Sequence, residues 1–115
     1  MKKPWSKYIF PEDIREKLEQ ILEGTELYIR DCKEGHPDGI YVSPKEKPRR
    51  IIAEAYWSAK GLTVYPSKEY LDIADKVIKK EPVFHEKYAR QYEYFLSETE
   101  LYAYAKELAK AGNLY

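Results

Sequence analysis

The sequence has little of several residue types whose presence would indicate particular classes of protein. Its single cysteine, Cys32, excludes a disulfide framework and a cluster of zinc-binding cysteines, so an intracellular, cytoplasmic protein is the simpler expectation. No apolar run approaches the roughly 18 residues that span a bilayer, and the N-terminal residues lack the apolar stretch of a signal peptide. We therefore expect no membrane partner.

An excess of one charge is also missing, because 20 basic residues balance 20 acidic ones. A nucleic-acid partner would need a local basic patch, since the whole protein is not basic. Asn and Met occur once each, whereas Lys and Glu occur 15 times each. Many charged residues and few thermolabile ones are typical of hyperthermophiles, so the composition predicts a thermophilic source. At 115 residues, the chain is expected to form one domain over 1–115.

The first half of the chain alternates between helix and strand patterns. Pro11 and two acidic residues begin a helix, whose apolar residues recur at helical spacing until Gly24. Alternating apolar residues then predict a strand over 26–32, paired with a second strand at 40–42. Residues 62–65 form a further short, β-prone segment.

Residues 48–61, PRRIIAEAYWSAKG, are ambiguous. Pro48 and Gly61 stand where a helix would begin and end, and three alanines favour helix. Apolar residues from Ile51 to Trp57 nevertheless alternate as they do in a buried strand. Periodicity leaves both structures open, and the local signals slightly favour the helix.

The second half has mainly helical patterns. Ser67 is the expected cap of a helix over about 68–80, and residues 83–96 are expected to form another helix. Ser97 and Glu100 form a capping box that begins a last helix ending near Gly112. The predicted fold class is α/β or α+β: a small sheet of three or four strands, an N-terminal helix and a helical C-terminal half.

Aromatic residues in this half divide into two groups. The helical spacing of the first group predicts a core stripe, comprising Tyr88, Tyr92 and Phe95 and continuing through Leu101, Ala105 and Leu108. The second group, Tyr94, Tyr102 and Tyr104, is left over and would form a partner-binding face. A homo-oligomer assembled through these Tyr-rich helices is therefore one hypothesis.

Asp38, in the sequence GHPDGI, has two interpretations. Pro, Asp and Gly in a row are typical of a tight turn, which is the simpler interpretation. If 49–57 is a strand, however, Asp38 begins one strand and Glu54 lies in the middle of the next. Two carboxylates on adjacent strands can hold Mg²⁺ or Mn²⁺, which activates a water molecule and neutralises charge on a phosphate.

GHPDGI followed by IIAEAYWSAKG resembles the metal-site core of the PD-(D/E)XK nuclease superfamily, particularly its RecB-type exonuclease branch. The resemblance implies that Asp38 and Glu54 are metal ligands, and that Gln91 matches a motif on a downstream helix. The lysine of the family falls at Tyr56 here, so Lys60 is the candidate for a relocated lysine. The implied function is a Mg²⁺- or Mn²⁺-dependent nuclease acting on DNA rather than RNA, with weak or absent cleavage.

Basic residues beside this candidate site would contact phosphates, unless they form only a solvated face. They are Lys47, Arg49 and Arg50, with Lys45 nearby. Two other functions stay open. One is a non-catalytic DNA- or protein-binding regulator of viral or plasmid origin, and the other is a homo-oligomeric structural protein.

Overall fold

The computed structural model describes residues 8–32, 36–86 and 91–111. In chain order the elements are α1 (Glu12–Leu22), β1 (Leu27–Asp31), β2 (Gly39–Pro44), β3 (Ala53–Ser58), β4 (Gly61–Pro66), a 3₁₀ turn η1 (Lys68–Tyr70), α2 (Leu71–Val77), β5 (Val83–His85), β6 (Gln91–Leu96) and α3 (Glu98–Ala111). The expected N-terminal helix and the first two strands are confirmed, with bounds that differ by a few residues.

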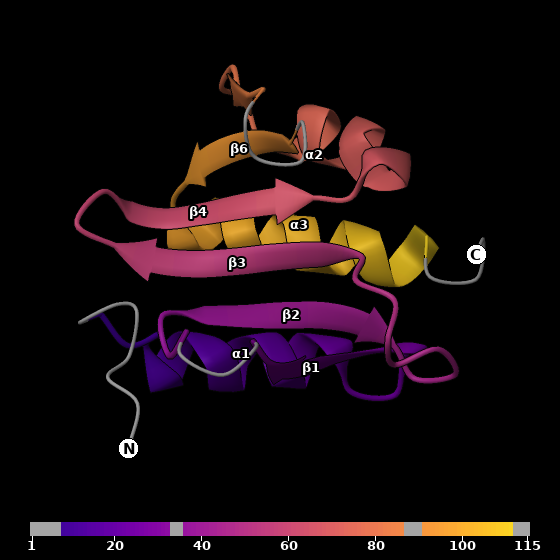
Figure 1. Cartoon of the computed structure of the whole chain (residues 1–115). Coiled ribbons are helices and arrows are strands. Elements are labelled where there is room, and N and C mark those ends of the chain that lie inside the picture. The colour runs from indigo at the N-terminus through magenta and orange to yellow at the C-terminus, as the bar shows by residue number, and fades with distance from the viewer. Residues whose placement is uncertain (1–7, 33–35, 87–90, 112–115) are drawn as a thin grey trace.

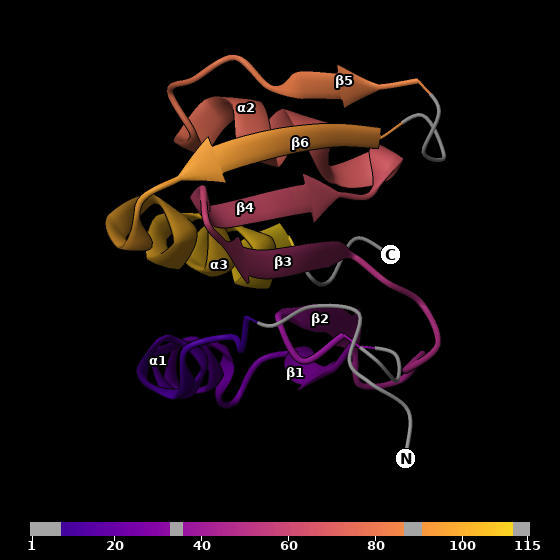
Figure 2. The ribbon, with the colours of Figure 1, turned by 60° about the vertical axis from the view of Figure 1, so that its left-hand side comes forward.

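The strands form one sheet of six in the order β1-β2-β3-β4-β6-β5, and every neighbouring pair is antiparallel. Helices α1 and α3 lie behind this sheet in Figure 1, and the turned view in Figure 2 places them on the same side. The fold is therefore mixed α and β, as predicted. The expected three or four strands are too few.

The core lies between the sheet and the helices. Strand alternation directs one row of apolar side chains toward the helices, whose own apolar stripes face back. The buried residues of the strands include Leu27, Ile29, Ile40, Val42, Ala53, Ala55, Leu62, Val64, Tyr94 and Leu96. The predicted stripe of Leu101, Ala105 and Leu108 on α3 is buried in the same core, which confirms that part of the pattern.

The ambiguous segment 48–61 is not helical, because Ala53–Ser58 forms β3 in the interior of the sheet. Helix propensity is a weak preference that tertiary contacts override. Here β3 gains ladder hydrogen bonds on both sides, from β2 and β4. Its two alanines, Ala53 and Ala55, are buried toward the helices, so the alternation was the informative signal.

The expected helix over 83–96 is also wrong, because this segment contains β5 and β6. Tyr94 and Leu96 point into the core from β6, whereas Tyr92 is 37% exposed and does not belong to a core stripe. Tyr94 and Tyr104 are almost fully buried, so the predicted partner-binding face of tyrosines does not form. Tyr88 lies outside the described residues.

The capping box at Ser97 is confirmed. The Ser97 backbone N–H donates to Glu100 Oε1 over 2.9 Å, and the Glu100 N–H donates to Ser97 Oγ over 3.2 Å. A strand rather than a helix precedes it. The helix expected over 68–80 is shorter than predicted, because the segment begins as the 3₁₀ turn η1 and α2 ends at Val77. The Ser67 hydroxyl makes no capping hydrogen bond.

Candidate functional site

The face of the sheet turned away from α1 and α3 carries polar and aromatic side chains. It faces the viewer in Figure 1, and no helix of the described ranges covers it. Cross-strand partners share a face, so the register assigns its members. We call it the open face; it includes Tyr28, Arg30, Tyr41, Ser43, Glu54, Tyr56, Thr63, Tyr65, Val83, His85, Gln91, Glu93 and Phe95, of which Tyr41, Ser43 and Thr63 are buried among their neighbours.

Glu54 lies near the centre of the open face and accepts hydrogen bonds from two neutral side chains. The Tyr56 hydroxyl donates to Glu54 Oε1 over 2.7 Å, and Gln91 Nε2 donates to Oε2 over 3.4 Å. Cys32 Sγ lies 3.5 Å from the Tyr56 hydroxyl oxygen. Burial, followed by the hydrogen bonds to Glu54 and Cys32, raises the pKa of Tyr56 well above its ordinary value. Tyr56 is therefore a neutral hydrogen-bond donor at physiological pH.

Glu93, on the neighbouring strand β6, is the centre of a second cluster in which a carboxylate accepts a hydrogen bond from a tyrosine. The Tyr65 hydroxyl donates to Glu93 Oε2 over 2.7 Å, and His85 Nε2 lies 2.9 Å from Oε1. Burial and then the bond to Glu93 raise the pKa of Tyr65. The rings of Tyr56 and Tyr65 meet edge to face, with centroids 5.7 Å apart. The two clusters thus form a continuous array across β3, β4, β6 and β5.

Two cations stack on aromatic rings of the open face. The guanidinium of Arg30 lies 4.7 Å from the centre of the Tyr41 ring, and its Nε donates to Ser43 Oγ over 2.9 Å. The Lys60 ammonium lies 5.7 Å from the centre of the Phe95 ring. Lys60 occupies the turn between β3 and β4, and the end of β3 is already about 13 Å from Glu54 along the strand. The structure does not place Lys60 beside Glu54.

Asp38 lies in a turn just before β2, where the Gly39 N–H donates to the His36 carbonyl over 3.3 Å. The Trp57 N–H donates to the Asp38 carbonyl over 2.9 Å, so Asp38 stands opposite Trp57 rather than Glu54. Trp57 packs against the core, and alternation assigns Asp38 to that helix-covered side. Asp38 Oδ1 is buried without a hydrogen-bond partner among the described residues.

The expected metal ligands are consequently not brought together. Asp38 lies opposite Trp57 at the start of β2, whereas the cross-strand partner of Glu54 on β2 is Tyr41. Within residues 8–32, 36–86 and 91–111, no group of three or more His, Cys, Asp or Glu side chains is arranged to hold a metal ion. The register therefore does not place Asp38 beside Glu54 as its cross-strand partner.

Basic residues gather in the loop between β2 and β3, which we call the basic loop (residues 45–50). Lys45, Lys47 and Arg49 are exposed, whereas Arg50 is half-buried and paired with Glu69. The loop leads back to the end of β4, where the Ser67 N–H donates to the Ile52 carbonyl over 2.9 Å. These cations therefore border one end of the sheet.

Gln91 does contact Glu54, although it begins β6 and does not belong to a downstream helix. Sequence reasoning did not identify Tyr65, His85 or Glu93 as site residues. The alternation of Gln91, Glu93 and Phe95 with Tyr92, Tyr94 and Leu96 could have placed Glu93 on one face of a strand, but it does not indicate Tyr65 or His85 as its neighbours.

Comparisons with known proteins assign no family. No protein-family model matches the sequence, no curated protein matches it, and no solved structure matches the fold. None of the helices in the described part of the chain is long and apolar enough to cross a membrane. The function must therefore be argued from the residues of the open face and of the basic loop.

Proposed function

We propose that this protein binds single-stranded nucleic acid on the open face without cleaving it. The observation that carries the proposal is a set of half-buried aromatic rings, Tyr28, Tyr56, Tyr65 and Phe95, on a helix-free sheet face bordered by the basic loop. Sheets of this kind bind single strands by stacking unpaired bases on aromatic side chains.

The geometry of the rings suits a chain of bases. Neighbouring strands lie about 4.8 Å apart, so Tyr56 on β3 and Phe95 on β6 are separated by about 10 Å across the sheet. Hydrogen bonds to Glu54 and Glu93 hold Tyr56 and Tyr65 in place before any partner arrives. Such pre-organisation lowers the entropy lost on binding.

Electrostatics restrict how a strand would lie. Glu54 and Glu93 repel phosphates, so bases rather than phosphates should lie over the middle of the open face. Each carboxylate retains acceptor capacity beyond its two hydrogen bonds and can accept from the exocyclic amine of cytosine or adenine. Phosphates would instead follow the cations at the margins, which are the basic loop, Arg30 and Lys60.

A metal-dependent nuclease is the second candidate, favoured by two observations. Residues 53–58 form a strand that follows β2, as the resemblance requires, and Gln91 contacts Glu54. Tyr56 nevertheless occupies the position of the family's lysine and is bonded to Glu54, while Asp38 lies opposite Trp57 rather than Glu54. We therefore expect weak or absent cleavage from the natural sequence.

Fluorescence anisotropy with labelled oligonucleotides tests the proposal. Single-stranded DNA, single-stranded RNA and duplex DNA are titrated with the protein in EDTA, at low and at moderate salt. We expect single strands to bind more tightly than the duplex, with an affinity that falls as salt rises. Lys47→Ala with Arg49→Ala should reduce the salt dependence, whereas Lys106→Ala, an exposed change on α3, should not.

The same samples separate binding from cleavage. Incubation with Mn²⁺ should leave the oligonucleotides intact for the natural sequence. Cleavage that needs Mn²⁺ and is lost in Glu54→Ala, or that appears in Tyr56→Lys, would support the nuclease hypothesis instead. If no oligonucleotide binds or is cut, both candidate functions are wrong.

A further inference from the structure

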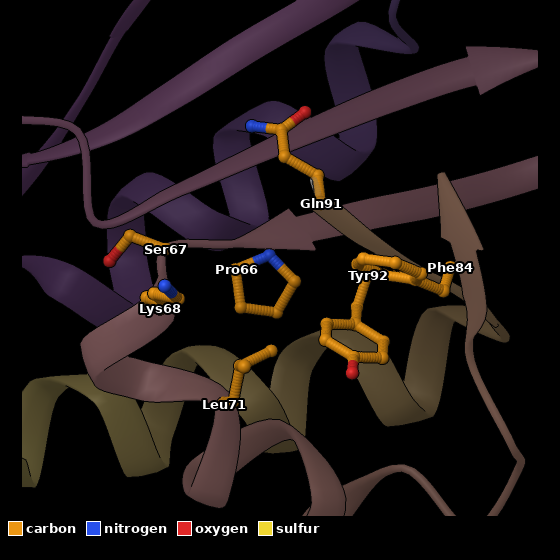
Figure 3. A pocket seen from close by; sticks show the side chains of 7 residues that line it. All are labelled: Pro66, Ser67, Lys68, Leu71, Phe84, Gln91 and Tyr92. Carbon is orange, nitrogen blue, oxygen red and sulfur yellow. The ribbon is translucent and has the colours of Figure 1, made fainter. Parts of the chain in front are cut away.

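A pocket of about 410 Å³ lies beside the end of β4 and the start of β6. Figure 3 shows its lining residues, which come from β4, η1, α2, β5, β6 and the residue joining β4 to η1. This volume is within the range of about 300–1,000 Å³ that is usual for small-molecule sites. Its residues are distinct from the two carboxylate clusters of the open face, apart from Gln91.

One wall of the pocket is aromatic. The rings of Phe84 and Tyr92 pack against each other with centroids 4.7 Å apart and an angle of 40° between them. They are 42% and 37% exposed, which is high for large hydrophobic residues. Pro66 and Leu71 complete the apolar lining (Figure 3). A planar ring would cover the exposed aromatic surface and would fit this lining.

The other side of the pocket is polar and carries a positive charge. Lys68 is exposed there, and the neighbouring Ser67 hydroxyl is buried without a hydrogen-bond partner in the described part of the chain. Glu69 follows along the chain but is paired with Arg50, so its charge is compensated. The exposed ammonium of Lys68 favours an anionic ligand group, whereas the buried Ser67 hydroxyl is closed off from the pocket.

We infer that this pocket binds one nucleotide, with its base against Tyr92 and Phe84 and its phosphate beside Lys68. The inference rests on the proposed function, because the pocket adjoins both parts of the nucleic-acid site. Gln91 lines the pocket while its amide donates to Glu54 on the open face, and Ser67 is hydrogen-bonded to the chain that leaves the basic loop. The nucleotide is either free in solution or the end of a bound strand.

Isothermal titration calorimetry with the full chain tests this site. The probes are adenosine 5′-monophosphate, adenosine, and an oligoadenylate with and without a 5′-phosphate. We expect the monophosphate to bind more tightly than adenosine, because only the former has a group for Lys68. Tyr92→Ala should weaken both by about tenfold, since a stacked base contributes about 1–3 kcal/mol. Lys68→Ala should weaken the monophosphate severalfold and leave adenosine unchanged.

Matched controls lie away from the pocket. Lys79→Ala removes an exposed lysine near the end of α2, and Tyr28→Ala removes a ring from the open face. Neither should change the affinity for the monophosphate. Circular dichroism checks that each variant is folded. Unchanged monophosphate binding in folded Tyr92→Ala and Lys68→Ala, or no binding to the natural sequence at millimolar concentration, would overturn the inference.

The oligonucleotides show whether the bound nucleotide is free in solution or the end of a strand. They also test the pocket separately from the open face. Stronger binding of the 5′-phosphorylated strand, in competition with the monophosphate, would assign the pocket to a strand end. Binding of the monophosphate with no binding of either strand would assign it to a free nucleotide and reject the proposed function. Strands that bind with sensitivity to Tyr28→Ala alone, without monophosphate binding, would reject the pocket and retain the open face.

Discussion

Replacing Tyr56 by Phe tests whether the open face is a rigid, hydrogen-bonded array. The change removes only the hydroxyl that donates to Glu54 Oε1 over 2.7 Å and contacts Cys32 Sγ. A hydrogen bond to a charged group contributes about 1.5–3 kcal/mol. Glu54 is half-buried, so water can replace part of the lost bond, and we expect the free energy of unfolding to fall by about 1–2 kcal/mol at pH 7.

The same variant should behave differently at alkaline pH. Burial and the bonds to Glu54 and Cys32 raise the pKa of Tyr56, so the folded protein keeps the phenol protonated where the unfolded chain, with a pKa of about 10, releases the proton. The unfolded state then binds fewer protons, so the free energy of unfolding falls as pH rises through 10. One proton corresponds to a slope of at most about 1.4 kcal/mol per pH unit, and the partial exposure of Tyr56 limits the pH range over which the loss continues. Tyr56→Phe has no phenol to titrate and does not show this loss. Its free energy of unfolding should therefore equal that of the natural sequence near pH 11–12.

Urea unfolding, followed by circular dichroism between pH 7 and 11.5, measures both effects. Tyr102→Phe is the matched control, because Tyr102 is a half-buried tyrosine on α3, away from the open face. Tyr102→Phe should lower the free energy of unfolding at pH 7 only slightly. If Tyr56→Phe unfolds at the same urea concentration as the natural sequence at every pH, the array does not hold Glu54 and the reasoning is wrong.

Three further changes have defined outcomes. Tyr104→Phe should leave thermal stability unchanged or raise it, because the Tyr104 hydroxyl is buried without a hydrogen-bond partner in the described ranges; a loss above about 1 kcal/mol would reveal a partner. Ser97→Ala should lower the free energy of unfolding by about 0.5–2 kcal/mol in urea, and an unchanged value would show that the capping box is not stabilising. Glu100→Gln should destabilise the protein at neutral pH. The hydrogen bond from the Ser97 backbone, and then Lys80, lower the pKa of Glu100, so this stabilisation is lost as pH falls through the folded-state pKa. Acid titration of the unfolding midpoint should therefore show a smaller drop for Glu100→Gln than for the natural sequence.

Sequence patterns predicted the elements whose formation depends on local signals. The helix after Pro11 and the capping box at Ser97 belong to this class, because their caps, charges and spacing lie within a few residues. The strand over 91–96 was mistaken for helix and the one over 53–58 was left open between helix and strand, because their stability comes from pairing with β4. Non-local pairing leaves only a period-two alternation in the sequence, and aromatic residues at three- and four-residue spacing concealed it.

The sequence likewise indicated some residues of the candidate site and not others. Glu54 was predicted to be a metal ligand on the condition that 49–57 is a strand, a role that stays a prediction, and Gln91 contacts it from a strand rather than a helix. The cluster of Glu93, Tyr65 and His85 could not be predicted, because three strands bring these residues together only after β6 pairs between β4 and β5. Asp38 was paired with Glu54 because the two lie on adjacent expected strands and match the nuclease motif, whereas the register pairs Glu54 with Tyr41 on β2.

The most direct test of the central claim is a nuclear magnetic resonance titration of the ¹⁵N-labelled protein with a single-stranded oligonucleotide in EDTA. Binding on the open face should shift the amide signals of Tyr28, Tyr56, Tyr65 and Phe95, together with those of the basic loop. Signals from the outer surfaces of α1 and α3 should change little. Shifts confined to those helices, or no shifts at saturating oligonucleotide, would contradict the account.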